Sequence, residues 1–122
     1  MIYFISGHRD ITEEEFRNLY IEKILEVIRK DPTAEFVVGD YWGVDSMAQE
    51  FLATTTNKVT VYHMFDSPRN YKSDKFDLKG GFKTDEERDA AMTKDSDIDI
   101  AFVRKGKRNS GTAQNIIRRY EF

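Results

Sequence analysis

Short apolar segments alternate with helical patterns along the chain, and this alternation constrains the fold more than any other feature. Ile2–Ile5, Glu35–Gly39 and residues 58–64 are apolar without polar alternation, which is typical of strands buried on both faces of a parallel sheet. Residues 98–103 form a fourth such segment. Because strands that alternate with helices need right-handed crossovers, we expect an α/β fold. It should be a Rossmann-like three-layer sandwich with a mainly parallel sheet of four or five strands.

Four segments have helical periodicity. The first opens with Thr12 and Glu15, spaced as in a capping box, and ends before Pro32. The others are Val44–Leu52, a helix that begins after a second capping box at residues 84–87, and a final helix from about residue 111. Residues 65–83 interrupt the rhythm with a polar stretch, which we expect to be a long loop that is functional or mobile.

Length and composition limit the class of protein. A chain of 122 residues suffices for one domain with one core, so residues 1–122 are predicted to form a single domain. The absence of cysteine excludes a disulfide scaffold, a thiolate nucleophile and a cysteine-ligated metal. A net charge of −3 argues against a nucleic-acid partner. Without an apolar run of about 18 residues or a signal peptide, we expect a cytoplasmic protein with no membrane contact.

The turn after the first strand is the first candidate for ligand binding. It contains Ser6, Gly7, His8 and Arg9 and precedes a helix. Free backbone N–H groups at such a turn attract an anion, and open parallel sheets bind ligands at the carboxyl ends of their strands. Gly7 should admit a ligand close to the backbone, and His8 and Arg9 should add donors. The alternative is an ordinary turn in which the glycine only satisfies backbone geometry.

An equivalent loop follows the second strand, from Gly39 through Gly43 to Asp45. Its aromatic residues Tyr41 and Trp42 are candidates to stack on a base, although Trp42 is equally suited to cover an edge of the core. Asp45 either accepts a hydrogen bond from a sugar hydroxyl or caps the following helix, because an acidic residue in the first turn of a helix is stabilising by itself.

Ser110, Gly111 and Thr112, at the start of the last helix, form the third candidate loop. Two hydroxyls and several backbone N–H groups at a helix N-terminus suit a phosphate. Four basic residues precede them: Arg104, Lys105, Lys107 and Arg108. The alternative is a solvated basic loop with a plain N-cap. Arg88 is a planar, permanently charged donor that is suited to clamp a phosphate.

No metal or other cofactor is expected. His8 and His63 have no third ligand at metal spacing, and no Ser, His and Asp order indicates nucleophilic catalysis. Asp95, Asp97 and Asp99 alternate as a metal cluster might be spaced, but they fit better as a loop that leads into a strand.

Taken in order, these motifs resemble the SLOG superfamily, which groups YspA-like, DprA-like and Lonely-Guy-like nucleotide-binding proteins. Residues 5–11 are similar to the family opening I-T/S-G-x-R, and residues 39–48 to its glycine loop and helix start. Residues 88–92, 97–102 and 110–113 are similar to its R-N-x-x-M, A-D … A-F and S-x-G-T-A segments. The likeness spans almost the whole chain.

The resemblance implies a bacterial or phage protein that senses or sequesters a nucleotide, a cyclic nucleotide or an ADP-ribose derivative. It implies a phosphate on Ser110, Gly111, Thr112 and Arg88, with Tyr41 or Trp42 near the base. Relatives often self-associate, and the helix from Val44 leaves surface for a partner, so a homodimer or a higher homo-oligomer is also expected.

The departures from the family pattern leave two other hypotheses. Asp40 replaces the second glycine of the loop, and Asn115 stands where phosphoribohydrolases of the Lonely Guy type carry a catalytic Glu. A nucleotide N-glycosidic hydrolase would therefore need a carboxylate from elsewhere, for instance Asp45 or Asp85, and its catalytic residues are unknown. The third hypothesis is a protein-interaction domain that grips its partner with residues 65–83.

Overall fold

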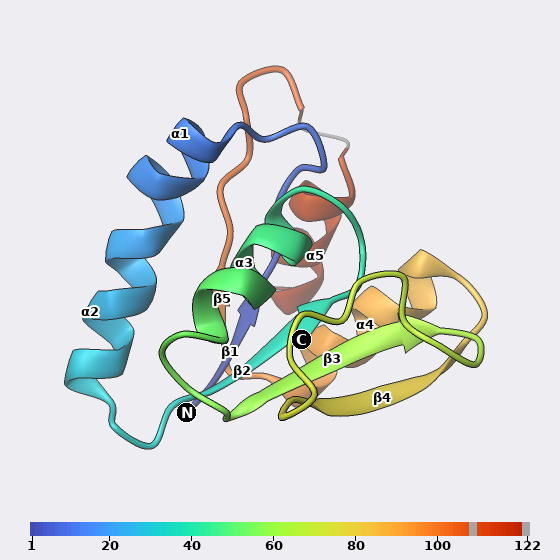
Figure 1. The fold of residues 1–122 in the computed structure, drawn as a ribbon. Coiled ribbons are helices and arrows are strands. Elements are labelled where there is room, and N and C mark those ends of the chain that lie inside the picture. The colour runs from blue at the N-terminus through green and yellow to red at the C-terminus, as the bar shows by residue number, and fades with distance from the viewer. Residues whose placement is uncertain (108–109, 121–122) are drawn as a thin grey trace.

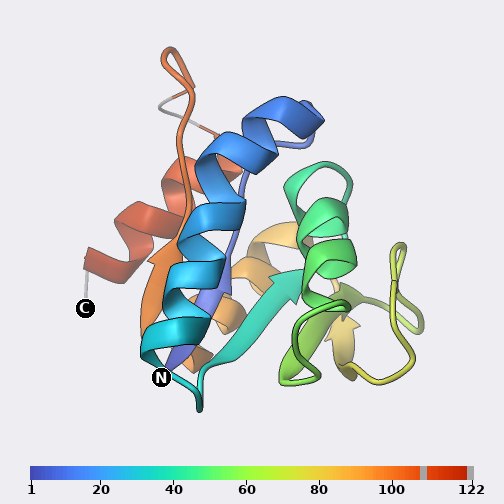
Figure 2. The ribbon, with the colours of Figure 1, turned by 60° about the vertical axis from the view of Figure 1, so that its left-hand side comes forward.

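The computed structural model describes residues 1–107 and 110–120. A five-stranded parallel sheet lies between two layers of helices (Figures 1 and 2). The strands are β1 (Ile2–Ile5), β2 (Glu35–Gly39), β3 (Val59–Met64), β4 (Asp77–Phe82) and β5 (Ile98–Ile100). They lie side by side in the order β4-β3-β2-β1-β5. The predicted α/β, Rossmann-like class is confirmed.

The helices cover both faces of the sheet (Figures 1 and 2). One face carries α1 (Glu13–Phe16), a π-helical turn (Arg17–Ile21) and α2 (Glu22–Lys30), which follow one another without a break, and α3 (Val44–Leu52). The other face carries α4 (Asp85–Asp95) and α5 (Gly111–Tyr120). Within the described ranges, every helix is too short or too polar to cross a membrane.

Strands β1, β2 and β3 are apolar without alternation because both of their faces are buried. Successive side chains of a strand point to opposite faces. Under α1, α2 and α3 lies the larger core, to which the strands contribute Tyr3, Ile5, Phe36, Val38, Val59, Val61 and Ile100. Under α4 lies a smaller core of Phe4, Val37, Tyr62 and Met92. The sequence pattern of β1, β2 and β3 follows from these two cores.

Threonine caps fix the start of α1 and α4. The predicted capping box is formed at α1, where Thr12 Oγ1 accepts from the Glu15 N–H and the Glu15 carboxylate accepts from the Thr12 N–H, both at 3.1 Å. At α4 only half of the box forms. Thr84 Oγ1 accepts from the Glu87 N–H (3.0 Å), but the Glu87 carboxylate accepts from the Lys83 N–H instead.

The prediction of one long loop over residues 65–83 is wrong for its second half, which forms strand β4. This strand pairs in parallel with β3 at the edge of the sheet, and its residues are almost all exposed. An exposed edge strand needs no apolar pattern, and this one contains Gly80 and Gly81. The hydrophobic periodicity of the sequence therefore contains no signal for it.

The first half of the same segment is fixed against the loop that follows β2. The side-chain amide of Asn70 donates to the carbonyl oxygens of Asp40 (2.9 Å) and Tyr41 (3.1 Å). Gln49 of α3 donates to the carbonyl oxygens of Gly39 and Asn70. These buried hydrogen bonds hold the β2–α3 loop in one conformation.

The predicted strand over residues 98–103 is correct only as far as Ile100. Because β1 ends at Ile5, the chain after β5 has no backbone partner on that side. The Phe102 N–H donates to the Tyr20 hydroxyl (3.2 Å), and the Arg104 N–H donates to Nε2 of His8 (2.9 Å). Two side chains thus take the place of a neighbouring strand.

Candidate functional site

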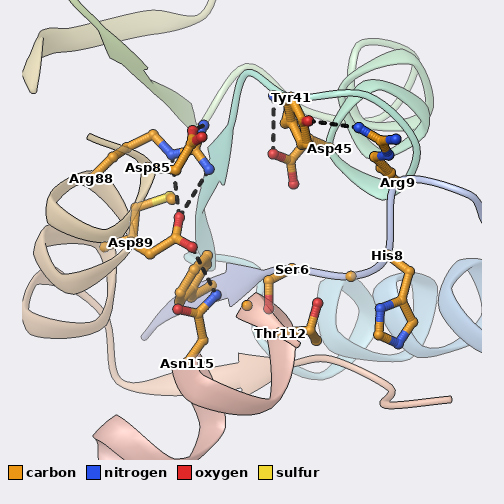
Figure 3. Close-up of a pocket in the computed structure, with 14 residues that line it drawn as sticks. Ser6, His8, Arg9, Tyr41, Asp45, Asp85, Arg88, Asp89, Thr112 and Asn115 are labelled. Carbon is orange, nitrogen blue, oxygen red and sulfur yellow. Dashed lines mark hydrogen bonds and ion pairs between the residues drawn. The ribbon is translucent and has the colours of Figure 1, made fainter. Parts of the chain in front are cut away.

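A cavity opens where the order of the strands changes direction. From β1 the chain adds β2, β3 and β4 on one side, and then returns to place β5 on the other side of β1. Open α/β sheets bind ligands outside the carboxyl ends of the strands at such a switch point. A cavity of about 220 Å³ lies there, between the loops after β1 and β2 and the N-termini of α4 and α5 (Figure 3).

The cavity brings together most of the predicted binding residues from all three loops. Those that line it are Ser6, Gly7, His8, Arg9, Tyr41, Asp45, Arg88, Gly111 and Thr112. Its other lining residues, which were not among the predicted binding residues, are Phe4, Asp85, Asp89, Met92 and Asn115. Figure 3 shows Asp85, Arg88 and Asp89 on one side of the cavity and His8 and Arg9 on the opposite side.

Four predicted residues do not line the cavity, namely Gly39, Trp42, Gly43 and Ser110. Trp42 is 55% exposed, so it covers no edge of the core. The Ser110 hydroxyl accepts from the Ala113 N–H (3.1 Å), which is the plain N-cap that the sequence left as an alternative. Ser110 therefore supports the start of α5.

Gly43 serves the contact between the first two loops. It has a φ of 73°, and a Cβ there would collide with the backbone of Arg9. The next residue, Val44, donates its N–H to the His8 carbonyl oxygen (3.3 Å). A residue with a side chain would push the two loops apart.

The end of β1 forms one wall of the cavity. Ser6 is 5% exposed, and its hydroxyl oxygen has no hydrogen-bond partner within the described residues. Its carbonyl oxygen accepts from the Tyr20 hydroxyl at 2.8 Å. The next residue, Gly7, also lines the cavity, but a Cβ at this position would collide with Val44 and Tyr20. The glycine is therefore required by the packing of the two helices, whatever lies in the cavity.

Arg88 reaches the cavity with its charge already balanced. Its guanidinium lies 2.7 Å from an oxygen of Asp40, 3.0 Å from Asp89 and 3.2 Å from Asp85. Burial alone would lower the pKa of Arg88, but the neighbouring carboxylates, Asp89 first among them, hold that pKa above its usual value. The sequence predicts Arg88 as a free donor for a phosphate, but its guanidinium is already paired with carboxylates of the protein itself.

Asp40, which replaces a glycine of the family pattern, is the fully buried partner of two arginines. Besides Arg88 it accepts from the Arg69 backbone N–H (2.8 Å) and guanidinium (2.9 Å). Burial would raise the pKa of Asp40, but Arg69 and Arg88 hold it below its usual value. A charged residue directly after a buried strand is the sequence signal that could have indicated this role.

Asp45 joins the β2–α3 loop to the cavity. Its Oδ2 accepts from the Tyr41 N–H at 3.1 Å, whereas the N-cap of α3 is Gly43, without a side-chain cap. Asp45 therefore fixes the loop and does not cap the helix. Burial raises the pKa of Asp45 to about 7. The cavity is thus lined by a carboxyl group that titrates near neutral pH.

Asp89 places a second carboxylate beside Asn115. Its Oδ1 accepts from Arg88, and its Oδ2 accepts from the Asn115 amide at 3.3 Å (Figure 3). Burial raises the pKa of Asp89, although the positive charge of Arg88 acts to lower it. Asp89 was not among the residues predicted from the sequence, although it stands where the family pattern has Asn. A carboxylate therefore lies next to the position at which the resemblance leads one to expect a Glu.

The mouth of the cavity is bridged by Arg9 and Tyr41. Arg9 Nη1 donates to the Tyr41 hydroxyl (3.1 Å), and the Arg69 guanidinium lies over the Tyr41 ring, 4.7 Å from its centroid. Arg9 forms no ion pair with any residue that the structure describes. Arg104, by contrast, pairs with Asp10 and Glu15.

Beyond Arg104, the basic segment carries the exposed Lys105 and Lys107, whereas Arg108 lies outside the described residues. In residues 1–107 and 110–120, no three His, Asp or Glu side chains are grouped as metal ligands. Asp95, Asp97 and Asp99 each accept from a different partner, respectively Tyr62 (2.6 Å), the Ile2 N–H (2.8 Å) and Arg119 (2.8 Å).

Comparison with models of known protein families, with curated proteins and with solved structures found no match for this chain. The resemblance to the SLOG superfamily and the nucleotide ligand that it implies therefore stay predictions.

Proposed function

We propose that this protein binds a nucleotide or a nucleotide-derived signalling molecule in the cavity at the switch point, as a sensor or a sequestering protein. The observation that carries the proposal is the buried hydroxyl of Ser6, which has no partner within the described residues and lines that cavity. Buried polar groups in native proteins almost always have a hydrogen-bond partner. A bound ligand would supply the missing one.

On this proposal, the part of the ligand that contacts Ser6 is an anionic group. Thr112 and Gly111 open α5, a helix of ten residues, and line the same part of the cavity as Ser6 (Figure 3). The N–H groups at a helix N-terminus and the helix dipole favour a negative charge. A phosphate at this end would find the hydroxyls of Ser6 and Thr112 and the N–H groups that open α5.

The other end of the cavity offers acceptors. Asp85 and Asp89 line it, and the cation beside them, Arg88, is already paired with both of them and with Asp40. A second phosphate at this end would meet carboxylates, which repel it. Sugar hydroxyls, which donate hydrogen bonds, suit it well. The two ends together match the phosphate and the sugar of a nucleotide.

The size of the cavity agrees with a partly enclosed ligand. Its volume of about 220 Å³ is below the roughly 300–1,000 Å³ of sites that enclose a whole drug-sized molecule. The phosphate and the sugar fill it, and the base extends to the mouth, where Tyr41 and the exposed Trp42 lie on one loop. Trp42 is not part of the cavity wall.

A thermal-shift and calorimetric screen tests the proposal with nucleoside monophosphates, cyclic nucleotides and ADP-ribose. Binding to the folded state adds about 2.7 kcal/mol of stability at a hundredfold excess over Kd. Ser6→Ala should weaken binding roughly 10- to 100-fold, the effect of one hydrogen bond to a charged group. Thr93→Val is the matched control, because the Thr93 hydroxyl is also buried without a described partner but lies outside the cavity. Equal binding by Ser6→Ala and the parent protein would contradict the proposal.

One observation favours the second candidate, a nucleotide N-glycosidic hydrolase. Asp89 supplies a carboxylate next to Asn115, and Asp45 carries a carboxyl group with a pKa of about 7. Asp89 would take a proton from water, which attacks the anomeric carbon of the sugar as the N-glycosidic bond breaks, and the Asp45 carboxyl would give its proton to the leaving base. Release of free base from nucleoside monophosphates, measured by chromatography, tests this candidate. Asp89→Asn should abolish the release; no release at high protein concentration rules out the hydrolase.

A further inference from the structure

His8 is held in one protonation state by a hydrogen bond from the segment that follows β5. Its Nε2 lies 2.9 Å from the backbone nitrogen of Arg104, and that nitrogen is a donor. Nε2 is therefore an acceptor and carries no proton. A neutral imidazole has one N–H, so the proton of His8 lies on Nδ1.

The charges around the ring keep it neutral. Burial lowers the pKa of His8, and the positive charges of Arg104 and Lys107 lower it further, whereas Asp10 and Glu15 act in the opposite direction and are outweighed. A proton on Nε2 would also place two N–H groups face to face. Burial, charge and the Arg104 hydrogen bond all favour the same Nδ1–H tautomer.

The donor of this tautomer is available to a ligand. Among the described residues no acceptor is hydrogen-bonded to Nδ1, and the His8 side chain is only partly buried. His8 lines the cavity together with Ser6 and Thr112, and Figure 3 shows its imidazole on the same side as Thr112. The ring thus adds a third side-chain donor to the end of the cavity that favours an anion.

We propose that His8 recognises the anionic group of the ligand as a neutral Nδ1–H donor, with Arg104 as the positioning residue that fixes its tautomer. This inference rests on the proposed function. The Arg104 guanidinium in turn binds Asp10 (2.9 Å) and Glu15 (3.3 Å), so its backbone nitrogen is held in place from both sides. The donor is therefore oriented before any ligand arrives, which lowers the entropy cost of binding.

Nitrogen-15 NMR of the histidine rings tests the tautomer directly. The chain has two histidines, so His63→Gln assigns the signals. We expect an unprotonated Nε2 and a protonated Nδ1 for His8 at pH 7, and a shift of the Nδ1 resonance when inorganic phosphate is added. A protonated Nε2, a charged ring, or an Nδ1 resonance unmoved by saturating phosphate would overturn the proposal.

Two amide variants separate the two nitrogens of the ring. The amide of Asn lies near the position of Nδ1 and donates, whereas the amide of Gln reaches the position of Nε2 and accepts from Arg104. His8→Asn should retain phosphate affinity within a few-fold, and His8→Gln should lose about tenfold, the effect of one hydrogen bond to an anion. If His8→Asn and His8→Gln bind phosphate equally well while Ser6→Ala binds it more weakly, the role of His8 is overturned but the proposed function is not. No binding of phosphate or of any nucleotide by the parent protein would overturn the proposed function as well.

Discussion

The guanidinium of Arg88 lies 2.7 Å from the fully buried carboxylate of Asp40, across 48 residues of sequence. This pair joins the end of β2 to the first turn of α4, beside the acidic end of the cavity. Arg88 is thereby a structural residue as well as a lining residue, and its removal affects the fold before it affects any ligand.

Arg88→Ala should therefore lower the free energy of unfolding by about 3–5 kcal/mol, because it leaves Asp40 buried with one cation fewer. Urea denaturation measures this loss. Arg17→Ala, at an exposed arginine of the first helix, is the control and should change stability by less than about 0.5 kcal/mol. A loss below about 1 kcal/mol in Arg88→Ala would show that the pair contributes little. Weak ligand binding by this variant is no proof of a phosphate contact.

Ser6→Ala should not destabilise the protein in the absence of ligand. The hydroxyl that it removes has no described partner, and an unsatisfied buried group is itself destabilising by about 1–3 kcal/mol. We expect an unchanged or slightly raised melting temperature, and the same for Thr93→Val. A clear drop for Ser6→Ala alone would reveal a partner for its hydroxyl within the folded chain.

Asp45 should make the protein less stable as the pH rises from about 4 to 7. Its pKa is about 7 in the folded protein and about 3.9 in an unfolded chain. Between these values the folded state binds more protons than the unfolded state, so stability falls with increasing pH. Asp45→Asn should reduce the difference between urea midpoints at pH 5 and pH 8. Asp74→Asn, at an exposed position, should leave that difference as it is in the parent protein.

Tyr20→Phe should cost about 1–3 kcal/mol, because it leaves the Ser6 carbonyl and the Phe102 N–H without their partner. Amide hydrogen exchange at Phe102 should become faster in the same variant. Tyr3→Phe, at another buried tyrosine of the larger core, serves as the comparison. If Phe102 exchanges at the same rate in Tyr20→Phe and in the parent protein, another group protects its amide.

The sequence predicts the elements that are buried on both sides. The bounds of β1 and β2 agree with the prediction, and α3 spans the predicted apolar stripe from Val44 to Leu52, because burial imposes an apolar pattern on these elements. β4 lies exposed at an edge and needs no such pattern, so the sequence predicts a loop there. The end of β5 was missed for another reason, since the side chains of Tyr20 and His8 replace its backbone partner.

The site was predictable as far as the topology brings loops together. Parallel strands end at one edge of the sheet, and so the loops at Ser6, Asp45 and Thr112 meet in one cavity. The balanced charge of Arg88 was not predictable, because Asp40 lies 48 residues away and meets Arg88 only after β2 and α4 have packed. Asp89 is the next residue along α4, but the sequence alone does not show that its carboxylate turns toward Arg88 and the cavity.

Trp42 gives the cavity a reporter that needs no label. It is the single tryptophan of the chain, and it is 55% exposed on the loop whose neighbouring residue, Tyr41, lines the mouth. A base that settles at this mouth changes the polarity around the indole, and with it the intensity and wavelength of the fluorescence. None of the substitutions described above alters Trp42, so a single optical titration can rank all of the variants on one scale.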